Sequence, residues 1–192
     1  MVVNPFKPSA GSSPPELIGR EASLERIREG VRDGPGAPGR VSLFTGARGI
    51  GKTVMLNEVE GAYLADGWMR VRLTATPGML GQLQADVRRL VSQLAPGARR
   101  RLTGVSAAGV GVDWENTEDA RSADLRSDVE ELLDLLAPDR GLLVTIDEVH
   151  GGERNQLREI AALSQHMVRD DRQFALAMAG LCLLYTSDAA DE

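Results

Sequence analysis

The sequence is poor in cysteine and in aromatic residues. Of its 192 residues, one is cysteine and 4% are aromatic. The lone Cys182 excludes an intrachain disulfide and argues against a cysteine-based metal cluster. A reducing compartment is the simplest setting for such a chain, so we predict a cytoplasmic protein. With so few aromatic residues, the core must rest on Leu, Val, Ile and Ala.

Long apolar runs are also missing from the sequence. No segment reaches the roughly 18 to 20 apolar residues that span a bilayer. Residues 1–15 contain prolines and Lys7 but no apolar stretch of the kind found in a secretory signal. We therefore expect no membrane partner.

Excess positive charge is a third absence. The formal net charge is -6, whereas a surface that follows nucleic-acid phosphates needs basic residues in excess. Arginines do cluster at residues 88–89 and 99–101. In an acidic chain, such a cluster is more typical of a solvated helix end than of a nucleic-acid site. A nucleic-acid partner stays open but unsupported.

The chain divides into three parts by composition. Residues 1–15 are rich in Pro, Ser and Gly and are predicted to be a flexible lead-in. Residues 16–181 are predicted to form one domain. Residues 182–192 fit neither a helix nor a strand pattern, so we interpret them as a non-native tail; a genuine polar terminus is the alternative.

Strand and helix patterns alternate within the central part. Short apolar runs predict strands at residues 41–44, 69–73, 142–146 and 174–179. Apolar residues at helical spacing predict helices at residues 21–32, 52–64, 80–94, 125–136 and 157–168. Residues 101–114 are small and Gly-rich, and predict a loop or hairpin. The alternation predicts an α/β fold with a mostly parallel sheet between two layers of helices, a three-layer α/β/α sandwich.

A glycine-rich motif follows the first predicted strand and opens a helix. It matches the pattern G-x-x-x-x-G-K-[ST] with Gly46, Ala47, Arg48, Gly49, Ile50, Gly51, Lys52 and Thr53. Glycines let the backbone turn its N–H groups toward a phosphate, and the helix that follows directs its first N–H groups at the same anion. Lys52 would reach the β- and γ-phosphates, and the Thr53 hydroxyl would bind Mg²⁺. The motif predicts a P-loop NTPase; a dinucleotide-binding loop would need the spacing G-x-G-x-x-G.

A pair of acids ends the third predicted strand. Asp147 and Glu148 follow the apolar residues 142–146, as in a Walker B motif. Asp147 would hold the metal, and Glu148 would orient or polarise the attacking water. We expect this strand to run beside the P-loop strand, which would bring the acids to the phosphate site. A strand end with solvated acids is the alternative.

His150 lies two residues after Glu148, so residues 147–150 match the DExH motif of some helicases. A helicase core would need a second P-loop-like domain, for which the chain is too short. We therefore interpret His150 as a surface or loop histidine.

Taken together, these motifs resemble the AAA+ ATPases. The sequence Leu17-Ile18-Gly19-Arg20-Glu21, a short helix, the P-loop and the acids after Ile146 follow the family's order. The resemblance is greatest to the domains of bacterial STAND-type and Orc/Cdc6-like proteins. It implies an adenine pocket lined by Ile18 and Gly19, and hence ATP with Mg²⁺ as the bound pair. Self-association and an effector domain are further partners that it implies.

The sequence also departs from the family. No polar residue stands near Ala179 and Gly180, where the family's sensor-1 residue is expected. The lid domain and the fifth strand are absent, so we expect the chain to be part of a longer protein. The leading hypothesis is an ATPase that couples MgATP hydrolysis to a conformational change. A slow nucleotide-gated switch and a DNA-loading initiator are the alternatives.

Overall fold

The computed structural model describes residues 21–95 and 117–181. In these ranges the helices are α1 (Glu21–Asp33), α2 (Lys52–Ala65), α3 (Met79–Leu94), α5 (Thr117–Leu135), η2 (a 3-10 turn, Val149–Gly151) and α6 (Arg154–Arg169). The strands are β1 (Val41–Gly46), β2 (Met69–Thr74), β3 (Leu142–Asp147) and β4 (Phe174–Leu181). Each predicted helix and strand is found. Its ends lie within three residues of the prediction, except that α5 begins at Thr117, eight residues before the predicted start.

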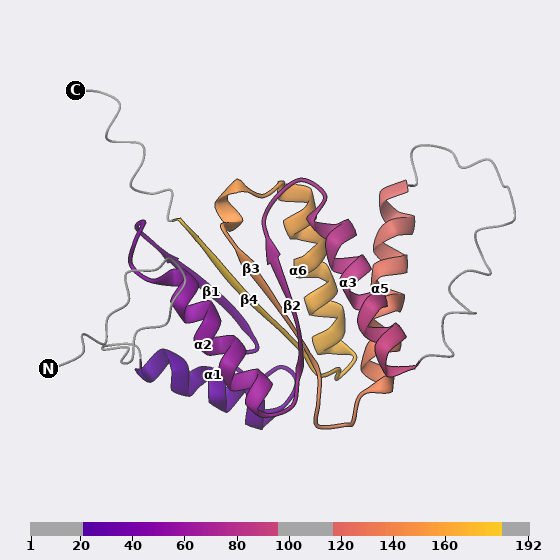
Figure 1. Cartoon of the computed structure of the whole chain (residues 1–192), viewed down its shortest axis with the longest axis horizontal. Coiled ribbons are helices and arrows are strands. Elements are labelled where there is room, and N and C mark those ends of the chain that lie inside the picture. Colours follow the sequence, from indigo (N-terminus) through magenta and orange to yellow (C-terminus); the bar gives the residue numbers. More distant parts are fainter. Residues whose placement is uncertain (1–20, 96–116, 182–192) are drawn as a thin grey trace, which may run out of the picture.

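The four strands form one parallel sheet in the order β1-β4-β3-β2. Helices α1 and α2 cover one face of the sheet, and α3, α5 and α6 cover the other (Figure 1). The predicted fold class, a P-loop NTPase sandwich of three layers, is thereby confirmed. Because all strands run the same way, their carboxyl ends lie along one edge of the sheet.

The two central strands supply apolar side chains to both faces. On β3, Leu142, Val144 and Ile146 join the larger core beneath α3, α5 and α6, whereas Leu143 joins the core beneath α1 and α2. On β4 the side toward α2 carries three alanines, Ala175, Ala177 and Ala179. This two-residue alternation is the pleat of a strand with both faces buried.

One expectation about the sheet is wrong. The acid-bearing β3 does not run beside the P-loop strand β1, because β4 lies between them and pairs with both. Residues 142–146 are fully buried and need a strand on each side, and β2 and β4 fill those places. The edge position falls to β1, on which Val41 and Leu43 are exposed.

Trp68 is a buried packing residue. Its ring lies edge-on against Tyr63 with the centroids 4.8 Å apart, and the Arg40 guanidinium lies 4.6 Å from its centroid. Arg40 is itself buried and donates hydrogen bonds to the carbonyl oxygens of Gly30 and Val31 near the end of α1. Positive charge at a helix C-terminus is favourable, so Arg40 joins α1 to the sheet.

Several expectations fall outside the described residues. They are the lead-in at 1–15, the adenine-pocket residues Ile18 and Gly19, the loop at 101–114 with Arg99–101, and the tail at 182–192. Within the described ranges, no helix has the length and apolar character needed to cross a membrane.

Glu60 on α2 is a buried acid that connects three elements. Its carboxylate accepts hydrogen bonds from Arg70 and Arg72 on β2 and, at 2.8 Å, from the hydroxyl of Thr145 on β3. Burial disfavours the charged carboxylate, but the hydrogen bonds from Arg72 and Thr145 and the charges of both arginines outweigh it. The pKa of Glu60 is therefore lowered. This network fixes α2 relative to β2 and β3.

Replacement of Glu60 by Gln should lower the free energy of unfolding at neutral pH by about 1 to 3 kcal/mol, because hydrogen bonds to a charged group are lost. A lowered pKa stabilises the fold above the unfolded-state pKa, and this contribution is lost as the pH falls through the folded-state pKa. The gap between wild type and Glu60→Gln should thus narrow below the ordinary glutamate pKa of 4.5. Denaturant titrations at neutral and acid pH measure it.

Glu29→Gln is the matched control, because Glu29 is an exposed glutamate on α1. It should leave stability nearly unchanged at both pH values. A gap for Glu60→Gln that stays constant as the pH falls would contradict the assigned role of its charge.

Candidate functional site

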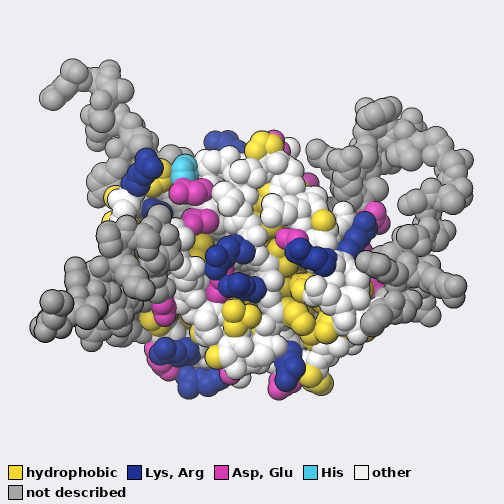
Figure 2. Space-filling model, viewed as in Figure 1, with side chains coloured by type: hydrophobic (Ala, Val, Ile, Leu, Met, Phe, Trp, Pro, Cys, Tyr) yellow, Lys and Arg dark blue, Asp and Glu magenta, His cyan; other side chains and the backbone are white. Residues whose placement is uncertain are grey.

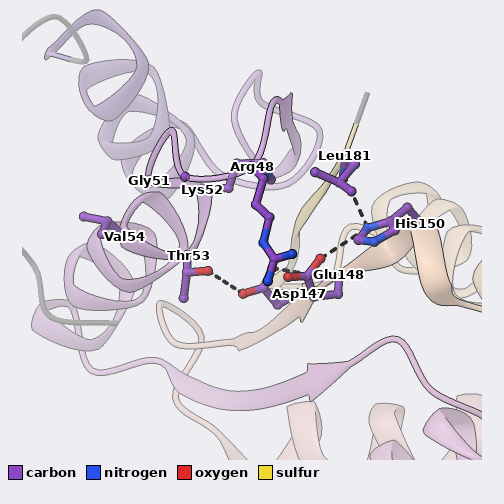
Figure 3. Close-up of a pocket in the computed structure, with 10 residues that line it drawn as sticks. Arg48, Gly51, Lys52, Thr53, Val54, Asp147, Glu148, His150 and Leu181 are labelled. Carbon is purple, nitrogen blue, oxygen red and sulfur yellow. Dashed lines mark hydrogen bonds and ion pairs between the residues drawn. The ribbon is translucent and has the colours of Figure 1, made fainter. Parts of the chain in front are cut away.

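A cavity of about 530 Å³ opens at the carboxyl edge of the sheet. One side is lined by Arg48, Gly49, Gly51, Lys52, Thr53 and Val54 from the loop after β1 and the start of α2. The other side is lined by Asp147, Glu148, His150 and Leu181, from the end of β3, the turn that follows it and the end of β4. The glycine-rich motif and the acid pair, 94 residues apart at Thr53 and Asp147, thus face one cavity (Figure 3).

Glycine is required at two positions of the loop. Gly49 has φ +85° and Gly51 has φ +83°, both in the left-handed region that side chains with a Cβ rarely adopt. Gly51 is also the residue that caps the N-terminus of α2. The loop therefore turns sharply and leads straight into the helix, so that the first N–H groups of α2 point toward the cavity.

Lys52 lies against its own loop. Its ammonium donates hydrogen bonds to the carbonyl oxygens of Gly46 at 3.1 Å and Ala47 at 2.8 Å. The side chain is held across the loop rather than extended into solvent. A phosphate in the cavity would meet a cation already at its rim.

Thr53 and Asp147 meet directly. The Thr53 hydroxyl donates a hydrogen bond to Oδ2 of Asp147 at 2.8 Å. The other carboxylate oxygen, Oδ1, accepts the backbone N–H of Glu148 at 2.8 Å. A hydroxyl and a carboxylate in contact are oxygen ligands of the kind that Mg²⁺ prefers.

Glu148 adopts an unusual backbone conformation. Its φ is +57° and its ψ is +39°, a left-handed conformation that is uncommon for any residue other than glycine. The turn directs its carboxylate to the cavity, where the side chain is 57% exposed. Such strain is frequent at functional sites.

His150 is a cavity-lining residue whose contacts the sequence analysis did not predict. It lies on the turn η2, as a loop histidine was expected to, but its Nδ1 is 3.2 Å from Oε2 of Glu148. The backbone N–H of Leu181, at the end of β4, lies 3.4 Å from the same nitrogen. The sequence carried one signal for this contact, the position of His150 two residues after Glu148.

Of the remaining motif residues, Arg48 lines the cavity, whereas Gly46, Ala47 and Ile50 do not. Gly46 and Ala47 provide the carbonyl oxygens that hold Lys52. Ile50 is 45% exposed at the tip of the loop. Arg48 lines the cavity, and its side chain extends across it toward the acids (Figure 3).

The donor set fits a metal bound together with a phosphate. Among the described residues, no group of three or more His, Cys, Asp or Glu side chains could hold a metal ion unaided. Mg²⁺ keeps several waters and is usually bound through one or two carboxylates plus substrate phosphates. Asp147 and Thr53, beside a loop suited to an anion, supply the protein share of such a site.

The neighbouring arginines of α3, Arg88 and Arg89, both pair with acids. Arg88 pairs with Asp128 at 2.8 Å, and Arg89 pairs with Asp86. On the face seen in Figure 2, basic and acidic side chains are interspersed over the described residues. The other arginines of the predicted cluster, at residues 99–101, lie outside the described residues.

The fold and the loop define the class of P-loop NTPases. Residues 16–176 match the model of the AAA ATPase domain family. The chain therefore belongs to that family, and the predicted AAA+ resemblance is confirmed. No curated protein matches the sequence.

Among solved structures, the fold is similar to that of Cdc6p from Pyrobaculum aerophilum. The TM-score is 0.59 at 18% identity, over 91% of this chain and 42% of that chain. The likeness is one of fold, and it agrees with the predicted Orc/Cdc6-like resemblance. The chain spans less than half the length of this structural relative.

The glycine that caps α2 and the glycine inside it should respond oppositely to replacement by alanine. Gly51→Ala should lower the free energy of unfolding by about 1 to 2 kcal/mol, because it forces a Cβ into the left-handed region. Gly61 lies inside the helix, and a Cβ there meets no atom within 4 Å. Gly61→Ala should raise stability by roughly 0.5 to 1 kcal/mol. Thermal or denaturant unfolding measures both, and shifts of the same sign would contradict the loop geometry.

Proposed function

We propose that the cavity binds MgATP and that the domain hydrolyses it. The observation that carries this proposal is the contact between Thr53 and Asp147, which joins the P-loop to the acid pair at 2.8 Å. Family membership supports nucleotide binding of the ATPase type. The phosphate chain would lie along the loop, with the metal at Thr53 and Asp147.

Each residue has a distinct part in the proposed reaction. The loop N–H groups and Lys52 bind the phosphates and offset their charge, which is where most phosphoryl-transfer catalysis arises. Bound Mg²⁺ supplies charge neutralisation of the phosphate oxygens. Asp147 and Thr53 hold that ion, and Glu148 orients or deprotonates the attacking water. Ile18 and Gly19 are proposed to line the adenine pocket.

We further propose that hydrolysis drives or resets a conformational change in a longer cytoplasmic protein. The domain would occupy residues 16–181, with 1–15 as a lead-in and 182–192 as a non-native tail. Slow turnover is a second candidate, because β4 ends in Ala179, Gly180 and Leu181 and offers no polar side chain to the cavity. Multiple-turnover rates compared with a single-turnover burst separate a working ATPase from a slow switch.

Lys52→Ala should weaken ATP binding by roughly 10- to 100-fold, because charged hydrogen bonds to phosphate are each worth about 1.5 to 3 kcal/mol. Calorimetric titration with a non-hydrolysable ATP analogue and Mg²⁺ measures the loss. Arg158→Ala is the control, since Arg158 is an exposed cation on α6. Equal affinity in Lys52→Ala and wild type would refute the proposed phosphate site.

Glu148→Gln should bind MgATP as wild type does and lose turnover by about 100-fold or more, because the amide cannot accept the proton of the attacking water. Steady-state phosphate release measures the turnover, and titration with the non-hydrolysable analogue measures the affinity, both on one preparation. Wild-type turnover that survives this replacement would exclude Glu148 as the base.

A further inference from the structure

His150 lies between the end of β3 and the end of β4. Its imidazole is 27% exposed on the turn η2, at the rim of the cavity. In Figure 3 the ring stands between the carboxylate of Glu148 and the backbone of Leu181, and contacts both. The ring thus connects the proposed base to the central strand β4.

Arg48 extends across the cavity toward the acids, but the contact that holds the Glu148 carboxylate is the one to His150. Among the described residues, His150 is the one hydrogen-bond or ion-pair partner of its carboxylate. An exposed glutamate samples several rotamers, and ordering one costs conformational entropy. A base must lie within hydrogen-bond reach of the water that it activates. Contact with a partly buried ring restricts the carboxylate to fewer orientations.

The position of the ring depends on close packing of the turn on β4. A Cβ added at Gly180 would lie 2.5 Å from Cγ2 of Val149 and 3.4 Å from the backbone N of His150. The strand therefore carries glycine where the turn crosses it. This packing places His150 Nδ1 next to the last N–H of β4.

Nδ1 of His150 lies near both the Glu148 carboxylate and the N–H of Leu181, and it can form a hydrogen bond with one of them at a time. With a proton, Nδ1 donates to Oε2 of Glu148; without it, Nδ1 accepts from the N–H of Leu181. The carboxylate is nearer, at 3.2 Å against 3.4 Å, and carries negative charge. Both differences favour the tautomer whose Nδ1–H points at Glu148.

We propose that His150 is a positioning residue that orients the Glu148 carboxylate toward the attacking water through an Nδ1–H hydrogen bond. The proposal rests on the proposed ATPase function and adds a residue that acts through Glu148 rather than on the nucleotide. It also gives the end of β4 a contact with the site through a histidine of the neighbouring turn.

The first test compares turnover in four variants. His150→Ala should lower kcat by about 10-fold or more, because a misplaced catalytic group loses the benefit of orientation, and it should leave KM for ATP unchanged. His150→Asn should recover most of the rate, since its amide N–H can donate from the place of Nδ1. His166→Ala is the control and should act as wild type, because His166 lies on α6 and contacts Arg126 and Arg169. In a Glu148→Gln background, His150→Ala should cause no further loss.

The second test needs neither nucleotide nor turnover. His150 and His166 are the two histidines of the sequence, so long-range ¹H–¹⁵N spectra of the imidazoles are readily assigned. At mildly alkaline pH, wild type should show His150 with its proton on Nδ1. Glu148→Gln should move the His150 signals and leave those of His166 in place. A purely structural histidine would not respond in this way.

The outcomes distinguish a failure of the positioning role of His150 from a failure of the proposed ATPase function. No ATP turnover in wild type would contradict the proposed function, and the positioning role would be rejected with it. Turnover in wild type with an equal kcat in His150→Ala would overturn the positioning role alone, as would a higher kcat. If His150→Ala does not fold, the spectra decide: a proton on Nε2, or no response to Glu148→Gln, also overturns the role.

Discussion

The site depends on holding α2 at a fixed place over the sheet. The Thr53 hydroxyl at the start of α2 contacts Asp147 at the end of β3, although β4 separates β3 from the P-loop strand. A second contact joins α2 and β3, where the Glu60 carboxylate accepts a hydrogen bond from the Thr145 hydroxyl at 2.8 Å. These two polar contacts fix the distance of α2 from the sheet and the direction of its axis. The P-loop before α2 is thereby placed next to Asp147 and Glu148.

The strand beneath α2 makes this reach possible. The side chains of β4 that face α2 are Ala175, Ala177 and Ala179, which add little thickness to the sheet. Larger residues there would push the helix outward and lengthen the gap between Thr53 and Asp147. The three alanines therefore contribute both to the core and to the short distance between Thr53 and Asp147.

Local features of the site could be predicted from the sequence, as could the meeting of the two motifs, whereas the order of the strands could not. The left-handed turns at Gly49 and Gly51 follow from the residues at those positions, as does the helix that begins at Lys52. The apolar run at residues 142–146 predicted a strand, but it carries no information about which strands pair with it. The place of β4 between β1 and β3 depends on where the chain returns after α6, and the expected adjacency was therefore wrong.

The same distinction explains why the contacts of His150 could not be predicted. Its spacing from Glu148 is visible in the sequence, whereas the nearness of Leu181 requires the strand order and the close packing at Gly180. At Ala179 and Gly180, β4 itself supplies no polar side chain. The fold brings the His150 imidazole, from the turn after β3, to the end of β4 instead. A missing side chain on one strand is thus weak evidence about a site that several strand ends build together.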